Sequence, residues 1–163
     1  MTLLALATSV LMVQELVLSF LPIQLTTVLL MIYTSVFGLR KTMLMMTIHV
    51  IIDNILLGSI GMFNIVIPMW LAWALIIIIF NFVSKRSSNL VIYMIVAYFF
   101  GHLYGLMFVP FQALLLNIDI IDYLLIDLLW EVVMGITNVI LVIWIYEPMN
   151  RYLSKLYQRY MNV

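Results

Sequence analysis

The sequence predicts an all-α, polytopic membrane protein with six transmembrane helices and both termini in the cytoplasm. Its 163 residues are 67% hydrophobic and only 9% charged, with a mean hydropathy of +1.24. No soluble domain of this size is so apolar. Apolar stretches about one membrane crossing long alternate with short polar breaks, and Lys and Arg are confined to a few of these breaks. We therefore expect a single membrane domain that comprises residues 1–163.

The first two expected spans are residues 3–20 and 24–39. No Lys or Arg precedes the first span, so it lacks the basic region of a signal peptide and we interpret it as a retained helix. Ala5 and Ser9 lie four residues apart on this helix, a small-xxx-small pair that lets another helix approach closely. The second span is short, since 16 residues at about 1.5 Å per residue barely cross a bilayer. Gly38 stands near its end.

The third expected span, residues 42–60, carries polar groups in its middle. His49 and Asp53 are four residues apart and share one face of a helix, and Asn54 follows directly. A carboxylate near the bilayer centre costs roughly 2.5 kcal/mol or more. Asp53 must therefore face a protein partner, a cavity or a ligand.

The fourth and fifth spans are expected at residues 65–83 and 89–108. Trp70 and Trp73 lie near the start of the fourth span. They suit an aromatic belt at the membrane interface, and they could instead line a ligand pocket. The fifth span is expected to stop before Pro110, and residues 111–120 then read as an external loop or a short surface helix.

The last expected span, residues 121–146, has a polar stripe. Asp127, Glu131 and Asn138 fall at helical spacing on one face of an otherwise apolar helix. We expect Pro148 to end this helix. Residues 148–163 then form an amphipathic cytoplasmic tail, suited to the membrane surface or to docking on a partner.

The basic residues set the topology. With six spans, all of them fall in the loops on one side of the membrane or in the C-terminal tail: Arg40, Lys41, Lys85, Arg86, Arg151, Lys155 and Arg159. By the positive-inside rule, that side is the cytoplasm. Five or seven spans would scatter the charges over both sides.

This topology brings polar residues of several spans to the outer half of the membrane. We expect them to line an outward-facing substrate site: Glu15, Gln24, Asp53, Asn54, Trp70, Trp73, Asp127, Glu131 and Asn138. The spans contain no Lys or Arg. The acidic groups are therefore protonated, bonded to neighbouring polar side chains, or paired with a ligand that brings donors or positive charge. The alternative is a sealed polar cluster that fixes helix packing.

Several other classes of function lack their signatures. The sequence contains no GxSxG, HExxH or Walker A motif, so we expect no enzyme and no cofactor. It has no cysteine, and its two histidines would give an incomplete metal site, so we expect no metal. A zero net charge without a basic patch gives no case for nucleic acid.

Loose motifs follow one another along nearly the whole chain in a distinctive order. They are Phe20–Thr27 with Phe37–Lys41, His49–Gly58, Ile67–Trp73, and Tyr123–Asn138 with Tyr146–Arg151. This order resembles the S component of energy-coupling factor (ECF) transporters, the vitamin importers of bacteria and archaea. An S component is the substrate-binding membrane subunit.

The resemblance implies a six-helix bundle in the plasma membrane of a prokaryote. It implies that a vitamin or related micronutrient binds in an outward-facing pocket. The partners would be a transmembrane coupling protein and two ATPases, which hydrolyse the ATP. Members of the family contact the coupling protein through an Ala-xxx-Ala face on the first span, where this chain has Ala5 and Ser9. The resemblance does not name the substrate.

A second resemblance belongs to another class of function. The chain is similar in length and apolar character to MreD, a membrane scaffold of the bacterial cell-shape machinery, and Asp53 to Gly58 is similar to a short aspartate-glycine stretch of that family. A scaffold would bind no ligand. It would have little reason to gather acidic and amide side chains around one cavity.

Overall fold

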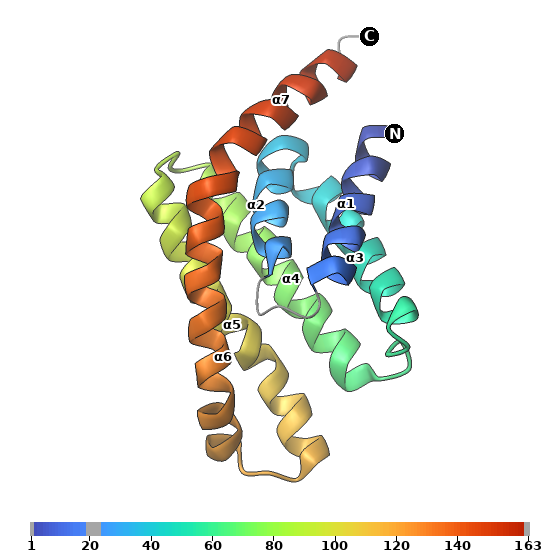
Figure 1. Ribbon diagram of the computed structural model, residues 1–163, viewed down its shortest axis with the longest axis vertical. Helices are drawn as coiled ribbons and strands as arrows, with labels where there is room; N and C mark the ends of the chain where they lie inside the picture. Colours follow the sequence, from blue (N-terminus) through green and yellow to red (C-terminus); the bar gives the residue numbers. More distant parts are fainter. Residues whose placement is uncertain (1, 19–23, 162–163) are drawn as a thin grey trace.

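The computed structural model describes residues 2–18 and 24–161, which are helical without any strand among them (Figure 1). The elements are α1 (Thr2–Leu18), α2 (Leu25–Phe37), α3 (Leu39–Leu56), α4 (Phe63–Ser84), α5 (Leu90–Leu116), α6 (Ile120–Leu141), η1 (Val142–Tyr146, a π-helical turn) and α7 (Glu147–Met161). The all-α prediction is confirmed. Residues 19 and 20, the end of the first expected span, lie outside the described part.

Within the described residues, three helices are long and apolar enough to cross a membrane. They are α4, α5 and the continuous helix Ile120–Tyr160, which contains α6 and η1. These helices indicate that the chain associates with a membrane. The first two helices are apolar but shorter, and α3 carries Arg40, Lys41 and Asp53 along its 18 residues.

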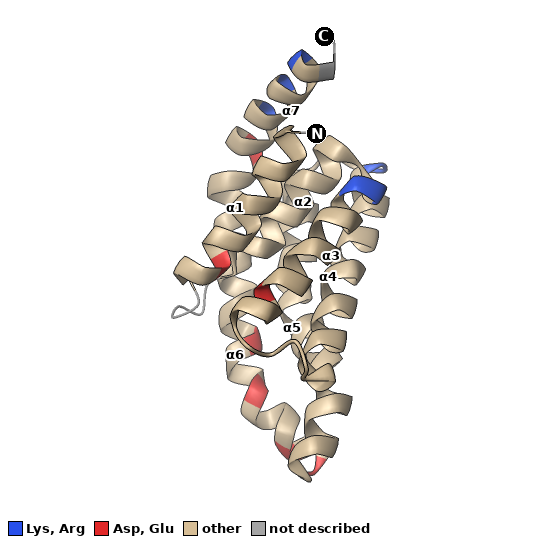
Figure 2. Cartoon of the chain, turned by 90° about the vertical axis from the view of Figure 1, so that its right-hand side faces the viewer, with Lys and Arg blue, Asp and Glu red and all other residues tan. Residues whose placement is uncertain are grey.

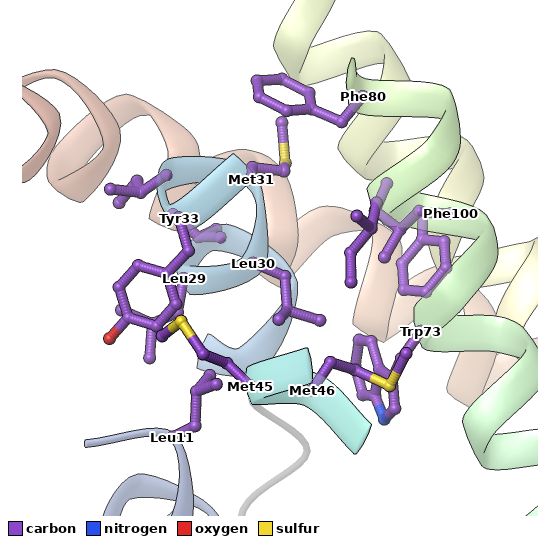
Figure 3. Close-up of a cluster of buried hydrophobic side chains, with 14 of the residues drawn as sticks. Leu11, Leu29, Leu30, Met31, Tyr33, Met45, Met46, Trp73, Phe80 and Phe100 are labelled. Atoms are coloured by element: carbon purple, nitrogen blue, oxygen red, sulfur yellow. The ribbon is translucent and has the colours of Figure 1, made fainter. Parts of the chain in front are cut away.

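The short helix α2 forms the centre of the bundle. Ten of its 13 residues are buried. Figure 3 shows its side chains gathered with Met46 of α3 and with Trp73 and Phe80 of α4. At about 1.5 Å per residue a helix of this length covers about 20 Å, less than the hydrocarbon thickness of a bilayer. Because most of its residues are buried, neighbouring helices surround α2 on almost every side.

A single glycine separates α2 from α3. Gly38 has a φ of +80°, which side chains with a Cβ rarely adopt. Its backbone N–H donates to the carbonyl oxygen of Thr34 over 3.1 Å, and its own carbonyl accepts from the N–H of Thr42 over 3.2 Å. The chain thus turns sharply and begins α3 with almost no loop.

Two glycines bring α5 and α6 together along a long seam. A Cβ added to Gly101 would lie 2.6 Å from the backbone nitrogen of Gly135, and one added to Gly135 would lie 2.9 Å from the carbonyl oxygen of Tyr98. The two backbones therefore approach each other as closely as small residues permit. In Figures 1 and 2, the ends of these helices extend beyond the rest of the bundle, away from the chain termini.

Two prolines do not end their helices as expected. Helix α5 continues through Pro110 to Leu116, so residues 111–116 are helix and not an external loop. Pro148 lies in the first turn of α7, directly after the π-helical turn. A proline removes one hydrogen-bond donor. Pro110 is accommodated within α5, and Pro148 directly follows a π-helical turn, where the hydrogen-bond register changes.

Charge is distributed unevenly along the bundle. Figure 2 shows the Lys and Arg residues at the end that also holds both termini. The acidic residues other than Glu147 lie in the middle of the bundle or toward its opposite end. The tail helix α7 packs back on α2 and α3, where Lys41 Nζ lies 2.5 Å from the Tyr157 hydroxyl and the rings of Phe37 and Tyr157 are 5.2 Å apart.

Candidate ligand-binding site

A cavity of about 380 Å³ lies between α4, α5 and α6. Its lining residues are Gln24, Met69, Gly101, Tyr104, Gly105, Phe108, Tyr123, Asp127, Trp130, Glu131 and Met134. Three residues predicted for the site, Gln24, Asp127 and Glu131, are among them. The described lining contains no Lys or Arg.

Glu131 is the most deeply buried acidic group of this cavity, at 7% exposure. One of its carboxylate oxygens, Oε2, lies 3.1 Å from His102 Nδ1. The other oxygen, Oε1, is buried and has no hydrogen-bond partner among the described residues. A buried acceptor without a donor is costly. Glu131 therefore brings a carboxylate without a Lys or Arg partner among the described residues to the cavity lining, with Oε1 packed against Gly105 of α5.

Gly105 makes room for two carboxylates at once. A Cβ added there would overlap Glu131 Oε1 and would lie 2.8 Å from Asp127 Oδ2. Asp127 and Glu131 are one helical turn apart on α6, so their side chains extend along the same face. Both carboxylates therefore converge on the same spot of α5, and any side chain at position 105 would occupy it.

Aromatic rings form much of the remaining wall. Tyr104 packs against Trp73, with 5.0 Å between ring centroids, and against Phe108, with 5.1 Å. Tyr123 and Trp130 of α6 contribute two further rings. The cavity thus combines acidic acceptors with aromatic faces, which is a typical composition for a small-molecule site.

Glu15, which sequence analysis assigned to the site, lies in a separate polar cluster between α1 and α2. Its Oε2 accepts hydrogen bonds from the Thr26 hydroxyl over 2.8 Å and from Gln14 Nε2 over 3.1 Å. Gln14 Nε2 also lies 2.5 Å from the Thr26 hydroxyl. Glu15 does not line the cavity. Gln24 lines the cavity, and its buried Oε1 has no partner among the described residues.

Asp53 and Asn54 of α3 are buried but lie outside the cavity lining. Asn54 holds the end of α3 in place: its Nδ2 donates to the Val50 carbonyl over 2.8 Å, and its Oδ1 accepts from the Ser59 hydroxyl over 2.7 Å. Asp53 is 2% exposed, and its Oδ1 has no partner among the described residues. The two residues thus do not contribute to the lining of this cavity, and their role in substrate binding stays a prediction.

Trp70, Trp73 and Asn138 also lie outside the lining and serve helix packing. The indole N–H of Trp70 donates to the Thr47 hydroxyl over 3.0 Å and joins α4 to α3. Trp73 is buried behind Tyr104 and so supports the cavity wall. Asn138 is fully buried and donates to the Ala97 carbonyl over 3.2 Å, which joins α6 to α5.

Ala5 and Ser9, the expected docking pair, are both exposed on the outer face of α1. The Ser9 hydroxyl donates to the Ala5 carbonyl over 3.0 Å, within its own helix. Neither side chain is therefore committed to packing inside the bundle.

Sequence reasoning did not assign His102, Tyr104, Gly105 or Tyr123 to the site. The signal for three of them was present, since Gly101-His102-xx-Gly105 is a close-approach pattern on α5. That pattern alone does not identify the helix that packs against it. The described residues contain no group of three or more His, Asp and Glu side chains placed to hold a metal ion.

No protein-family model matches this chain, and comparisons with curated proteins and with solved structures likewise found no significant match.

Proposed function

We propose that this chain is the substrate-binding membrane subunit of an ECF-type importer, which captures a vitamin or related micronutrient. The observation that carries the proposal is the cavity of about 380 Å³, whose described lining combines Asp127 and Glu131 with aromatic rings and contains no Lys or Arg. Carboxylates without a Lys or Arg partner are costly inside a membrane, and a ligand that brings donors or positive charge would compensate for them.

In this proposal the chain crosses the plasma membrane of a prokaryote six times, with both termini in the cytoplasm. The clustering of the basic residues at the end of the bundle that holds both termini supports this orientation. The cavity then opens toward the outside. Captured substrate would be delivered by association with a coupling protein and two ATPases.

The outer face of α1 is the docking surface in this proposal. Ala5 and Ser9 are small and exposed, which would let a partner helix approach closely. Ser9→Trp should therefore abolish assembly with the coupling protein and leave the fold intact. Ile126→Trp is the matched control, because Ile126 is also exposed, on another helix, α6.

The test is purification of the tagged chain from its native cells in mild detergent, with co-purifying proteins and small molecules identified by mass spectrometry. A coupling protein and two ATPases that co-purify with the unmodified chain and with Ile126→Trp, but not with Ser9→Trp, are the expected result. Recovery of cell-shape proteins instead, with no small molecule, would contradict the importer and support the scaffold.

A further inference from the structure

We propose that the cavity binds an organic cation, one that carries N–H donors on its charged group and has a flat, apolar body. This inference rests on the proposed function, because it takes the cavity between α4, α5 and α6 as the substrate site. It adds the chemical class of the substrate.

Charge is the first argument. Asp127 and Glu131 converge on Gly105, and the described lining offers no Lys or Arg to balance them. His102 lies beside only one oxygen of Glu131. Even if that imidazole carries a proton, the Asp127 carboxylate has no cationic partner in the described lining. A carboxylate or phosphate ligand would be repelled here, whereas a cation would be attracted.

Hydrogen bonding narrows the class further. The Asp127 and Glu131 carboxylates are acceptors only, and the described lining has no Lys or Arg to donate to them, so a ligand with N–H or O–H groups is favoured. An ammonium or amidinium group supplies such donors together with positive charge, and charge-assisted hydrogen bonds are the strong ones. A quaternary ammonium has the charge and no donor. It would form no hydrogen bond to either carboxylate.

The aromatic wall accounts for the body of the ligand. Tyr104, Phe108, Tyr123 and Trp130 line the cavity beside the two carboxylates. Their faces attract cations and stack against flat rings. A neutral polyol could donate to the carboxylates but would use neither their charge nor these rings. The cavity of about 380 Å³ suits a small molecule with one or two rings.

The experiment uses four probes that share one indole ring. Tryptamine is a protonated amine, its N,N,N-trimethyl derivative is a quaternary cation, tryptophol is neutral, and indole-3-acetate is an anion. Affinity for the full-length chain in mild detergent is measured by calorimetric titration. We expect tryptamine to bind at least tenfold more tightly than any of the other three.

Two variants locate the effect. Glu131→Gln keeps the side-chain shape but removes the charge, and we expect it to weaken tryptamine binding at least tenfold. Asp127→Asn is the second variant, should Glu131→Gln fold poorly. Asp122→Asn is the matched control, because Asp122 is exposed on the same helix outside the cavity lining. It should bind tryptamine as the unmodified chain does.

The outcomes separate this inference from the function beneath it. The proposal of a cationic ligand would be contradicted if all four probes bound equally, if the neutral or anionic probe bound best, or if no probe bound. It would also be contradicted if neither cavity variant changed tryptamine binding. If the coupling protein and ATPases still co-purify in those cases, the importer stands without it. Selective tryptamine binding in a chain that recruits no coupling protein would uphold the cation and contradict the importer.

Discussion

Helices α3 and α6 both carry acidic residues within apolar sequence, yet the fold treats them differently. Asp53 of α3 is 2% exposed and lines no part of the cavity. Asp127 and Glu131 of α6 face the cavity across Gly105. What separates the two regions is the helix opposite. Large side chains of α2 and α4 fill the space beside α3, whereas α5 offers glycines to α6 at two successive turns.

The difference teaches that an open site in a helical bundle depends on what the neighbouring helix lacks. Gly101 brings the α5 and α6 backbones together, and Gly105, one turn further, leaves space that the two carboxylates enter. Close packing at Gly101 thus sets the separation of α5 and α6 at Gly105, where the two carboxylates fit between the helices. The acidic residues alone do not make the site.

The largest expected effect follows from this division of roles between the two glycines. In Gly101→Ala the new Cβ would lie 2.6 Å from the nitrogen of Gly135 and 2.9 Å from the carbonyl oxygen of Glu131, both of them backbone atoms. The helices must move apart, and we expect a loss of about 3 kcal/mol in the free energy of unfolding. Unfolding in mild detergent by titration with a denaturing detergent measures it.

Gly105→Ala is the matched comparison for Gly101→Ala. Its Cβ would meet the carboxylate ends of Glu131 and Asp127, which can rotate away. We expect a loss of no more than about 1 kcal/mol in stability, together with weaker tryptamine binding. Equal destabilisation by the two alanines would show that both glycines serve packing alone, and the contrast between the turns would be lost.

Sequence reasoning could predict the helices because their apolar length and polar breaks are local properties. The all-α fold and most helix bounds follow from them. The ends of α5 and of the last long helix could not be predicted, because no local pattern reveals that α5 continues through Pro110 or that a π turn precedes Pro148. Helical spacing likewise placed Asp127 and Glu131 on one face without indicating the glycine opposite.

Sequence reasoning also could not predict which polar residues line the cavity and which are buried in the core. Asp53, Asn54 and Asn138 are polar residues within apolar helical sequence, as Asp127 and Glu131 are. Their burial depends on which side chains of other helices fill the space around them. That information is three-dimensional, so the sequence-based set of site residues is wider than the cavity.

Asp53→Asn tests whether Asp53 of α3 lies outside the binding site. The change keeps the size of the side chain and removes a buried ionisable group whose Oδ1 lacks a partner among the described residues. We expect the free energy of unfolding to rise by about 2 kcal/mol, with tryptamine affinity unchanged. Should this variant instead weaken binding as strongly as Glu131→Gln, the two acidic regions would form one site.

The smallest expected effect concerns Trp70, whose N–H donates to the Thr47 hydroxyl over 3.0 Å and joins α4 to α3. Trp70→Phe keeps an aromatic ring and removes the indole donor, whereas the Thr47 hydroxyl still donates to the Met43 carbonyl. We expect a loss of about 1 kcal/mol in the free energy of unfolding. Ligand affinity should not change, because Trp70 does not line the cavity. Trp144→Phe is the control. Trp144 is 74% exposed on the outer surface of the bundle, so this variant should leave stability unchanged.

Equal stability of the two variants would mean that the hydrogen bond contributes nothing to the α3–α4 contact. A loss of affinity in Trp70→Phe alone would instead extend the binding site across α4 toward α3, and the region that separates Asp53 from the cavity would then belong to the site.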